Sequence, residues 1–140
     1  MKYLGAAIIG VVLNIVLSLL QAQFMSSSEN NELITQFMET SADWIIVIFY
    51  IIVILVVPLF EEVLFRGGIW KFFAHFGNDK VAAVVVAIIF TFLHSWEAAI
   101  FLLPFSVYLS YLRYNNGNIW SGVVAHVGFN TAGLLLPRLF

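Results

Sequence analysis

Residues 45–66 read IIVIFYIIVILVVPLFEEVLFR, an uncharged apolar run that ends in two glutamates and, four residues on, an arginine. Within residues 45–60, Pro58 is the one residue outside the hydrophobic set. Such a run is typical of a helix in a lipid bilayer, where ionisable side chains are costly and mark functional sites by default. The same reasoning applies to His94 and His126, each of which lies within an apolar segment. These polar positions indicate chemistry or transport.

The composition of the whole chain agrees with a membrane protein. It has 140 residues, of which 62% are hydrophobic and 10% charged, whereas a soluble domain has about 25% charged residues. The net charge of −2 and the scattered basic residues argue against nucleic-acid partners. The chain contains no cysteine, which excludes disulfides, thiolate zinc sites and a cysteine nucleophile.

The expected fold is all-α, a polytopic transmembrane helix bundle with four to five membrane segments. Residues 4–20 are long enough to cross about 30 Å of hydrocarbon, and a cleaved signal peptide is the alternative interpretation. Residues 24–43 are acidic and are predicted to form an extracytoplasmic loop. Residues 1–43 therefore form an N-terminal helix and loop, followed by a helical core at 44–140. The helices of this core are predicted at residues 44–76, 81–93, 98–112 and 119–136, the last ended by Pro137.

Two turns separate the core helices, one at Gly77-Asn78 and one at Asn115-Asn116-Gly117-Asn118. The basic residues lie mainly on the side of these turns. The positive-inside rule therefore places the N-terminus and both turns in the cytoplasm, and we expect an integral protein of a bacterial plasma membrane. The basic residues on that side are Lys2, Lys71, Lys80 and Arg113, against Arg138 on the other.

The spacing of the polar residues predicts a common site. Glu61 and His94 lie at nearly equal distances on either side of Gly77-Asn78, so a helical hairpin would place them at similar depth. His126 lies within its own helix, and Asn130 is one turn further on the same face. We expect these four side chains to converge on one cavity that opens toward the cytoplasm.

The two glutamates are predicted to have different roles. Glu62 and Arg66 are four residues apart and can form a pair along one helix face. Glu61 points about 100° away from Glu62 and is left free of that pair. The sequence therefore predicts one structural glutamate, Glu62, and one reactive glutamate, Glu61.

Three motifs occur in order within the apolar segments: Glu61-Glu62-x-x-x-Arg66, Phe90-Thr91-Phe92-Leu93-His94 and His126-Val127-Gly128-Phe129-Asn130. Each motif alone is a weak signal, but all three together are specific. With them the chain resembles the CPBP family over about residues 56–136. This family comprises the type II, Rce1-like CAAX prenyl endopeptidases and the bacteriocin-processing or immunity proteins, also called Abi proteins.

The resemblance implies an intramembrane protease that hydrolyses a peptide bond with water and forms no covalent acyl-enzyme. By this resemblance Glu61 activates the water with assistance from His94. His126 and Asn130 form the oxyanion hole. The residues expected to support this catalytic set are Glu62, Arg66 and Phe90.

The implied partners are the lipid bilayer and a membrane-embedded or lipid-anchored peptide substrate, either CAAX-like or leader-type. Family proteases usually have additional helices around this core. A second copy of the chain, in a homodimer, is one way to complete the walls around the substrate.

No cofactor or metal is expected. The alternative is a zinc ion held by Glu61, His94 and His126, with water in an open position. The chain contains no H-E-x-x-H motif, and these candidates are spread over three helices without a diagnostic spacing.

Two further functions remain alternatives to the protease. The first is a bacteriocin self-immunity protein of the same fold, which acts by binding with weak or no catalysis. The second is a transporter or channel subunit that uses the polar cluster as a proton relay. This second alternative fits the costly carboxylates, but it does not fit the oxyanion-type pair of His126 and Asn130.

Overall fold

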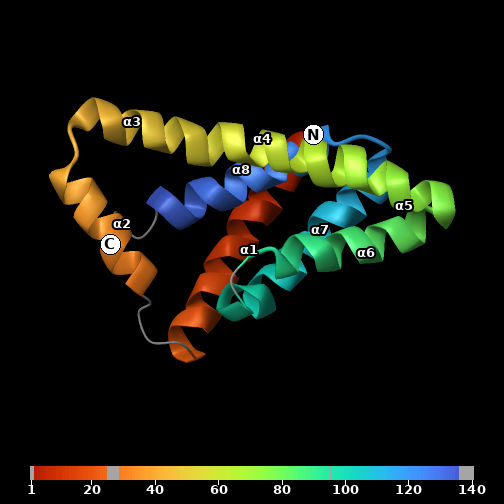
Figure 1. Ribbon diagram of the computed structural model, residues 1–140, viewed down its shortest axis with the longest axis horizontal. Coiled ribbons are helices and arrows are strands. Elements are labelled where there is room, and N and C mark those ends of the chain that lie inside the picture. Colours follow the sequence, from red (N-terminus) through yellow and green to blue (C-terminus); the bar gives the residue numbers. More distant parts are fainter. Residues whose placement is uncertain (1, 25–28, 95, 136–140) are drawn as a thin grey trace.

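The computed structural model describes residues 2–24, 29–94 and 96–135, and within these ranges all regular structure is helical. Figure 1 shows a long rod formed by α3 to α5, with α6 and α8 packed beside it. The elements in chain order are α1 Lys2–Phe24, α2 Glu29–Thr40, α3 Asp43–Ile51, η1 Ile52–Val56, α4 Val57–Glu62, η2 Val63–Ile69, α5 Trp70–Phe76, α6 Asp79–Phe92, α7 Trp96–Asn116 and α8 Trp120–Leu135.

The helix predicted at residues 44–76 is confirmed as one continuous rod, Asp43–Phe76, of 34 residues. At about 1.5 Å per residue it is roughly 50 Å long. It begins after Ala42, whose backbone is extended, and ends at Gly77. Two π-helical segments interrupt its α-helical hydrogen bonding, η1 before Pro58 and η2 after Glu62.

A side chain from another helix binds one backbone carbonyl in each π-helical segment. In a π-helix, a carbonyl accepts from the N–H five residues on. For Val53 that residue is Pro58, which has no N–H, and Asn130 Nδ2 donates to the Val53 carbonyl at 2.9 Å instead. In η2, Arg113 Nε donates to the Arg66 carbonyl at 3.0 Å. Tertiary contacts therefore stabilise both irregular segments.

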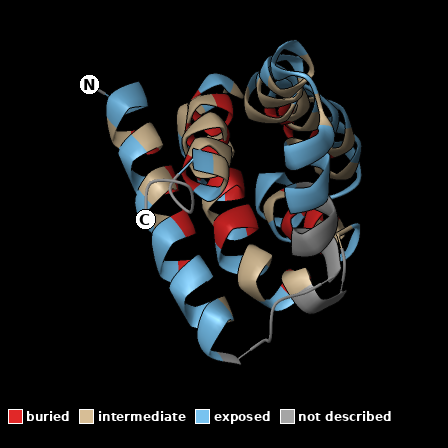
Figure 2. Cartoon of the chain, turned by 90° about the vertical axis from the view of Figure 1, so that its left-hand side faces the viewer, coloured by how far each residue is buried: buried red, intermediate tan, exposed pale blue. Residues whose placement is uncertain are grey.

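Two helices of the described chain are long and apolar enough to cross a membrane, Lys2–Gln23 and Asp43–Phe76. The helices α6 and α8 have 14 and 16 residues, fewer than the roughly 20 that a perpendicular span needs. Many large apolar side chains are exposed, and Figure 2 marks the exposed residues of the helices in pale blue. Phe60 is 65% exposed and Phe92 is 70% exposed. These outer faces suit contact with lipid.

The buried residues between the helices form two clusters. One joins α1, α7 and α8, and the other joins the second half of the long rod to α6. Glycines let α1 approach α8 closely, because a Cβ on Gly10 would overlap the Ala125 carbonyl and one on Gly128 would lie 2.7 Å from the Ala7 carbonyl oxygen. Small residues at such crossings are typical of membrane bundles.

Both predicted turns are present. Asn78 caps α6 by accepting hydrogen bonds from the backbone N–H groups of Lys80 and Val81. Gly117 has a φ of +66°, a left-handed conformation that favours glycine. The helix predicted at 98–112 is longer, Trp96–Asn116, and contains Pro104. The predicted end of the last helix at Pro137 lies outside the described residues.

The prediction of a loop at residues 24–43 was wrong, because Glu29–Thr40 forms the helix α2. Leu33, Ile34, Phe37 and Met38 recur at helical spacing within this acidic segment. The Phe37 ring contacts the Phe49 ring of α3, with 5.4 Å between centroids. The helical spacing of these apolar residues explains why the polar composition did not produce a loop.

Candidate functional site

The predicted pair of Glu62 and Arg66 forms in the interior of the bundle. Arg66 Nη1 donates to Glu62 Oε1 at 3.0 Å, and both side chains are 0% exposed. Arg66 Nη2 also donates to the Ser106 hydroxyl at 3.0 Å and to the Ser106 carbonyl at 3.2 Å. The guanidinium lies over the Phe90 ring, 4.4 Å from its centroid. Because a buried charge needs this degree of pairing to persist, the contacts explain how Arg66 is tolerated there.

His126 lies between the two glutamates. Its Nδ1 is 3.3 Å from Glu62 Oε1, and its Nε2 is 3.4 Å from Glu61 Oε2. The His126 side chain is 5% exposed, whereas that of Glu61 is 21% exposed. A continuous polar chain therefore runs from buried Arg66 through Glu62 and His126 to partly exposed Glu61. With one arginine and two carboxylates, a protonated His126 would make this cluster electrically neutral.

Gly122, on α8, leaves room for the Glu62 side chain. A Cβ at this position would lie 2.5 Å from Glu62 Oε2, so any larger residue would displace the carboxylate. Gly122 is one helical turn before His126, so both residues present the same face of α8 to Glu62. The Oε2 atom is buried and has no hydrogen-bond partner among the described residues.

His94 follows the end of α6. Its ring contacts the Phe90 ring, which also contacts the His126 ring. His94 Nδ1 is 2.8 Å from the Phe90 carbonyl oxygen. A carbonyl can only accept, so Nδ1 carries the proton and the Nε2 of a neutral ring has a free lone pair. The Phe90 ring centroid is 4.9 Å from that of His94 and 5.8 Å from that of His126. Among the described residues, the ion-pair partner of Glu61 is His126 rather than His94.

Asn130 contacts the long rod at a different level from His126. Its amide nitrogen donates to the Val53 carbonyl in η1, eight residues before Glu61. His126 contacts both Glu61 and Glu62, whereas His94 and Asn130 each form a hydrogen bond with a backbone carbonyl. The convergence of Glu61, His94, His126 and Asn130 on one cavity stays a prediction. An apolar groove lies between α6 and α7, and none of these residues lines it.

The described residues contain no group of three or more histidine, aspartate or glutamate side chains arranged to hold a metal ion. The zinc ligands considered from the sequence were Glu61, His94 and His126. In the structure, His126 turns both ring nitrogens toward carboxylates, so its contacts are those of an ion-pair network.

Three residues that support the site were not predicted. They are Ser106, which binds Arg66, Gly122, which faces Glu62, and Arg113, which binds the Arg66 carbonyl. A signal was available for two of them. Ser106 is a polar residue in an apolar stretch, the same feature that drew attention to His94, and Gly122 is one turn from His126.

Comparison with known proteins bears on this arrangement. Residues 43–132 match the family described as type II CAAX prenyl endopeptidase, Rce1-like. The chain belongs to this family. The matched region covers more than half of the chain and includes all three motifs, and the family consists of membrane proteins.

Relatives of this Rce1-like protein include proteins of Lactococcus lactis. UPF0177 protein YbdI of subspecies lactis is 25% identical over 138 residues, which cover 94% of this chain and 73% of the relative. UPF0177 protein YajF of the same subspecies is 35% identical over 69 residues, 48% of this chain and 33% of the relative. A UPF0177 protein in the abiGi 5′ region of subspecies cremoris is 31% identical over 90 residues, 63% of this chain and 36% of the relative. No solved structure matches the chain.

Proposed function

We propose that this protein is an intramembrane endopeptidase that hydrolyses a peptide bond of a membrane-associated substrate, CAAX-like or leader-type, with water activated by Glu61. The observation that carries the proposal is the polar chain from Arg66 to Glu61. Its inner members are held rigidly away from water, and its last carboxylate is 21% exposed. A fixed, partly accessible carboxylate beside a histidine suits general-base catalysis.

In the proposed reaction, Glu61 takes a proton from a water molecule, and the resulting hydroxide attacks the carbonyl carbon of the substrate. The carbonyl oxygen becomes an oxyanion. When the tetrahedral intermediate collapses, the C–N bond breaks and the leaving amine takes the proton from Glu61. His94 orients the water by accepting a hydrogen bond from its second O–H group. The acceptor is the Nε2 lone pair, since Nδ1 is engaged by the Phe90 carbonyl.

His126 and Asn130 are proposed to stabilise the oxyanion. Glu62 holds the His126 ring through its Nδ1 atom. In the free protein, the His126 Nε2–H group points toward Glu61. During the reaction, the same group can donate a hydrogen bond to the oxyanion. The Asn130 amide nitrogen carries two N–H bonds. One donates to the Val53 carbonyl and fixes the amide plane, which leaves the second as an oxyanion donor.

The alternative is a protein of the same fold that confers self-immunity by binding, without catalysis. The close packing of the site favours this alternative, because the side chains of Glu62 and Arg66 are 0% exposed and that of His126 is 5% exposed. A substrate can approach only the Glu61 end of the cluster, unless helices move apart.

A cleavage assay separates the two functions. Wild type and Glu61→Gln are purified in detergent and incubated with membrane-associated peptides of the CAAX and leader types. We expect wild type to cleave at least one class, and Glu61→Gln to fold with an unchanged melting temperature but without turnover.

Turnover should survive thorough chelation, because the proposed mechanism uses no metal. Activity lost on chelation and restored by zinc would overturn the glutamate mechanism. Equal immunity or binding by Glu61→Gln and wild type, without cleavage by either, would support the binder.

We further propose that the protein lies in the bacterial plasma membrane with its N-terminus in the cytoplasm and four to five membrane segments. The excess of basic residues near the N-terminus and both turns supports this orientation. Since the chain contains no cysteine, a single cysteine introduced at Lys2 or at Asn116 can be labelled selectively. Labelling of either position in intact cells by a membrane-impermeant maleimide would contradict the orientation.

A further inference from the structure

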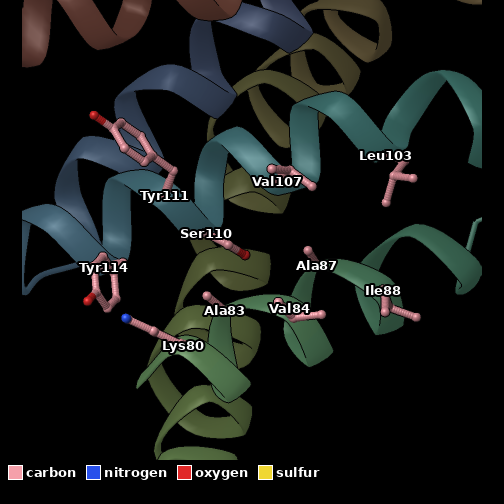
Figure 3. Close-up of a pocket in the computed structure, with 10 residues that line it drawn as sticks. All are labelled: Lys80, Ala83, Val84, Ala87, Ile88, Leu103, Val107, Ser110, Tyr111 and Tyr114. Atoms are coloured by element: carbon pink, nitrogen blue, oxygen red, sulfur yellow. The ribbon is translucent and has the colours of Figure 1, made fainter. Parts of the chain in front are cut away.

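A groove on the outer face of the bundle, between α6 and α7, is separate from the proposed catalytic residues. Its volume is about 500 Å³. Ala83 and Ala87 form the α6 side, where small side chains leave the hollow, and Val107 and Leu103 line the α7 side. Figure 3 shows these residues facing each other across the groove. An apolar hollow on a membrane-facing surface suits a hydrocarbon chain.

The one charged side chain that lines the groove, Lys80, lies at one of its ends. Lys80 and Tyr114 lie at that end, and Figure 3 shows the Lys80 side chain extending toward Tyr114. Leu103 and Ile88 lie at the other end. Leu103 is eleven residues from Tyr114 on α7, a distance of about 16 Å along the helix. The groove therefore has the polarity of a single lipid molecule, with a cation placed where an anionic headgroup would lie.

Ser110 provides an independent sign of a ligand. It is 2% exposed, and its hydroxyl has no hydrogen-bond partner among the described residues. A helical serine usually binds the carbonyl four residues earlier, but the Ser106 carbonyl accepts from Arg66 Nη2. Figure 3 shows the Ser110 hydroxyl directed into the groove. A buried hydroxyl without a partner is costly, and a ligand acceptor would satisfy it.

We propose that this groove binds one acyl chain of an anionic phospholipid. Lys80 and Tyr114 bind the phosphate, Ser110 donates to an ester carbonyl, and the acyl chain lies along Val107 toward Leu103. Ser110 is about 6 Å from Tyr114 along α7, so the hydroxyl lies deeper than the headgroup, where the ester belongs. Basic sites between membrane helices are known to favour anionic headgroups.

The spacing of these groups distinguishes a phospholipid from free phosphate. Free phosphate would use Lys80 and Tyr114 but would leave Ser110 and the apolar length of the groove unoccupied. A neutral phospholipid would fill the apolar length without using the charge of Lys80. The proposed ligand requires all three features together.

The test measures retained phospholipid on the full-length protein by native mass spectrometry, in micelles that contain equal amounts of phosphatidylglycerol and phosphatidylcholine. Wild type should retain phosphatidylglycerol preferentially. Lys80→Gln should reduce that preference about fivefold, the effect of one basic residue near the headgroups. Lys71→Gln is the matched control, because Lys71 is exposed on α5 and does not line the groove.

Two further variants address the depth of the site. Ser110→Ala, which is nearly isosteric, should weaken retention of both lipids by about two- to tenfold. Ala83→Leu should fill the hollow and abolish retention; if that variant fails to fold, Lys80→Gln and Ser110→Ala still decide the question.

Inorganic phosphate should not displace the lipid. Equal effects of Lys71→Gln and Lys80→Gln, or retention unchanged in both Lys80→Gln and Ser110→Ala, would overturn the proposal. Neither result depends on proteolytic activity.

Discussion

The polar cluster has a closed end and an open end, and they differ in what they can do. At the closed end, Arg66 and Glu62 are 0% exposed, and Arg66 has three hydrogen-bonded contacts as well as the Phe90 ring. At the open end, Glu61 is 21% exposed and contacts His126 at 3.4 Å. Adjacent glutamates in the sequence thus occupy opposite environments. The closed end is suited to holding charges in place, and the open end is suited to proton transfer.

The largest expected effect is at the closed end. Glu62→Gln leaves Arg66 buried without its ionic partner, so we expect a loss of about 3–5 kcal/mol in the free energy of unfolding. Glu61→Gln, at the open end, should cost far less. Chemical denaturation of both variants in the same detergent checks this. Equal losses, or a larger loss for Glu61→Gln, would show that the two ends are assigned the wrong way round.

Asn130 lies outside the polar cluster, and a variant of it tests whether its amide also donates to the oxyanion near Glu61. Asn130→Ala should lower turnover by about 10²–10³, the cost of one oxyanion-hole donor, with little change in KM. Thr131→Val is a neighbouring control, since its hydroxyl donates to the Val127 carbonyl of its own helix. If Asn130→Ala instead lowers stability while the rate per folded molecule is unchanged, the amide serves only the Val53 carbonyl.

Gly122 tests how tightly the closed end is packed. A Cβ there would meet Glu62 Oε2, so Gly122→Ala should destabilise the protein by about 1–3 kcal/mol. Gly5→Ala is the matched control, because nothing lies within 4 Å of its added Cβ, and alanine is the better helix former. A melting temperature of Gly122→Ala at or above that of Gly5→Ala would indicate that Glu62 has room to move.

Much of the helical layout could be predicted because it depends on local interactions. In lipid, the backbone N–H and C=O groups of the long apolar run before Glu61 have to form hydrogen bonds within their own helix. The Glu62–Arg66 pair depends on a spacing of four residues, and the capping by Asn78 depends on residues two and three positions away. The acidic composition of residues 29–40 was misleading, because the apolar residues within it recur at helical spacing and the segment forms α2.

The sequence by itself determined which residues are costly in an apolar environment, and so which residues belong to the candidate site. Only the tertiary structure decided which of them meet. His126 reaches Glu62 across 64 residues, and Asn130 reaches Val53 across 77. Such pairs depend on how α8 crosses the long rod, where Gly122 permits close approach and Pro58 leaves a carbonyl without its donor. No local periodicity encodes that crossing, because it results from packing between helices that are distant in the chain.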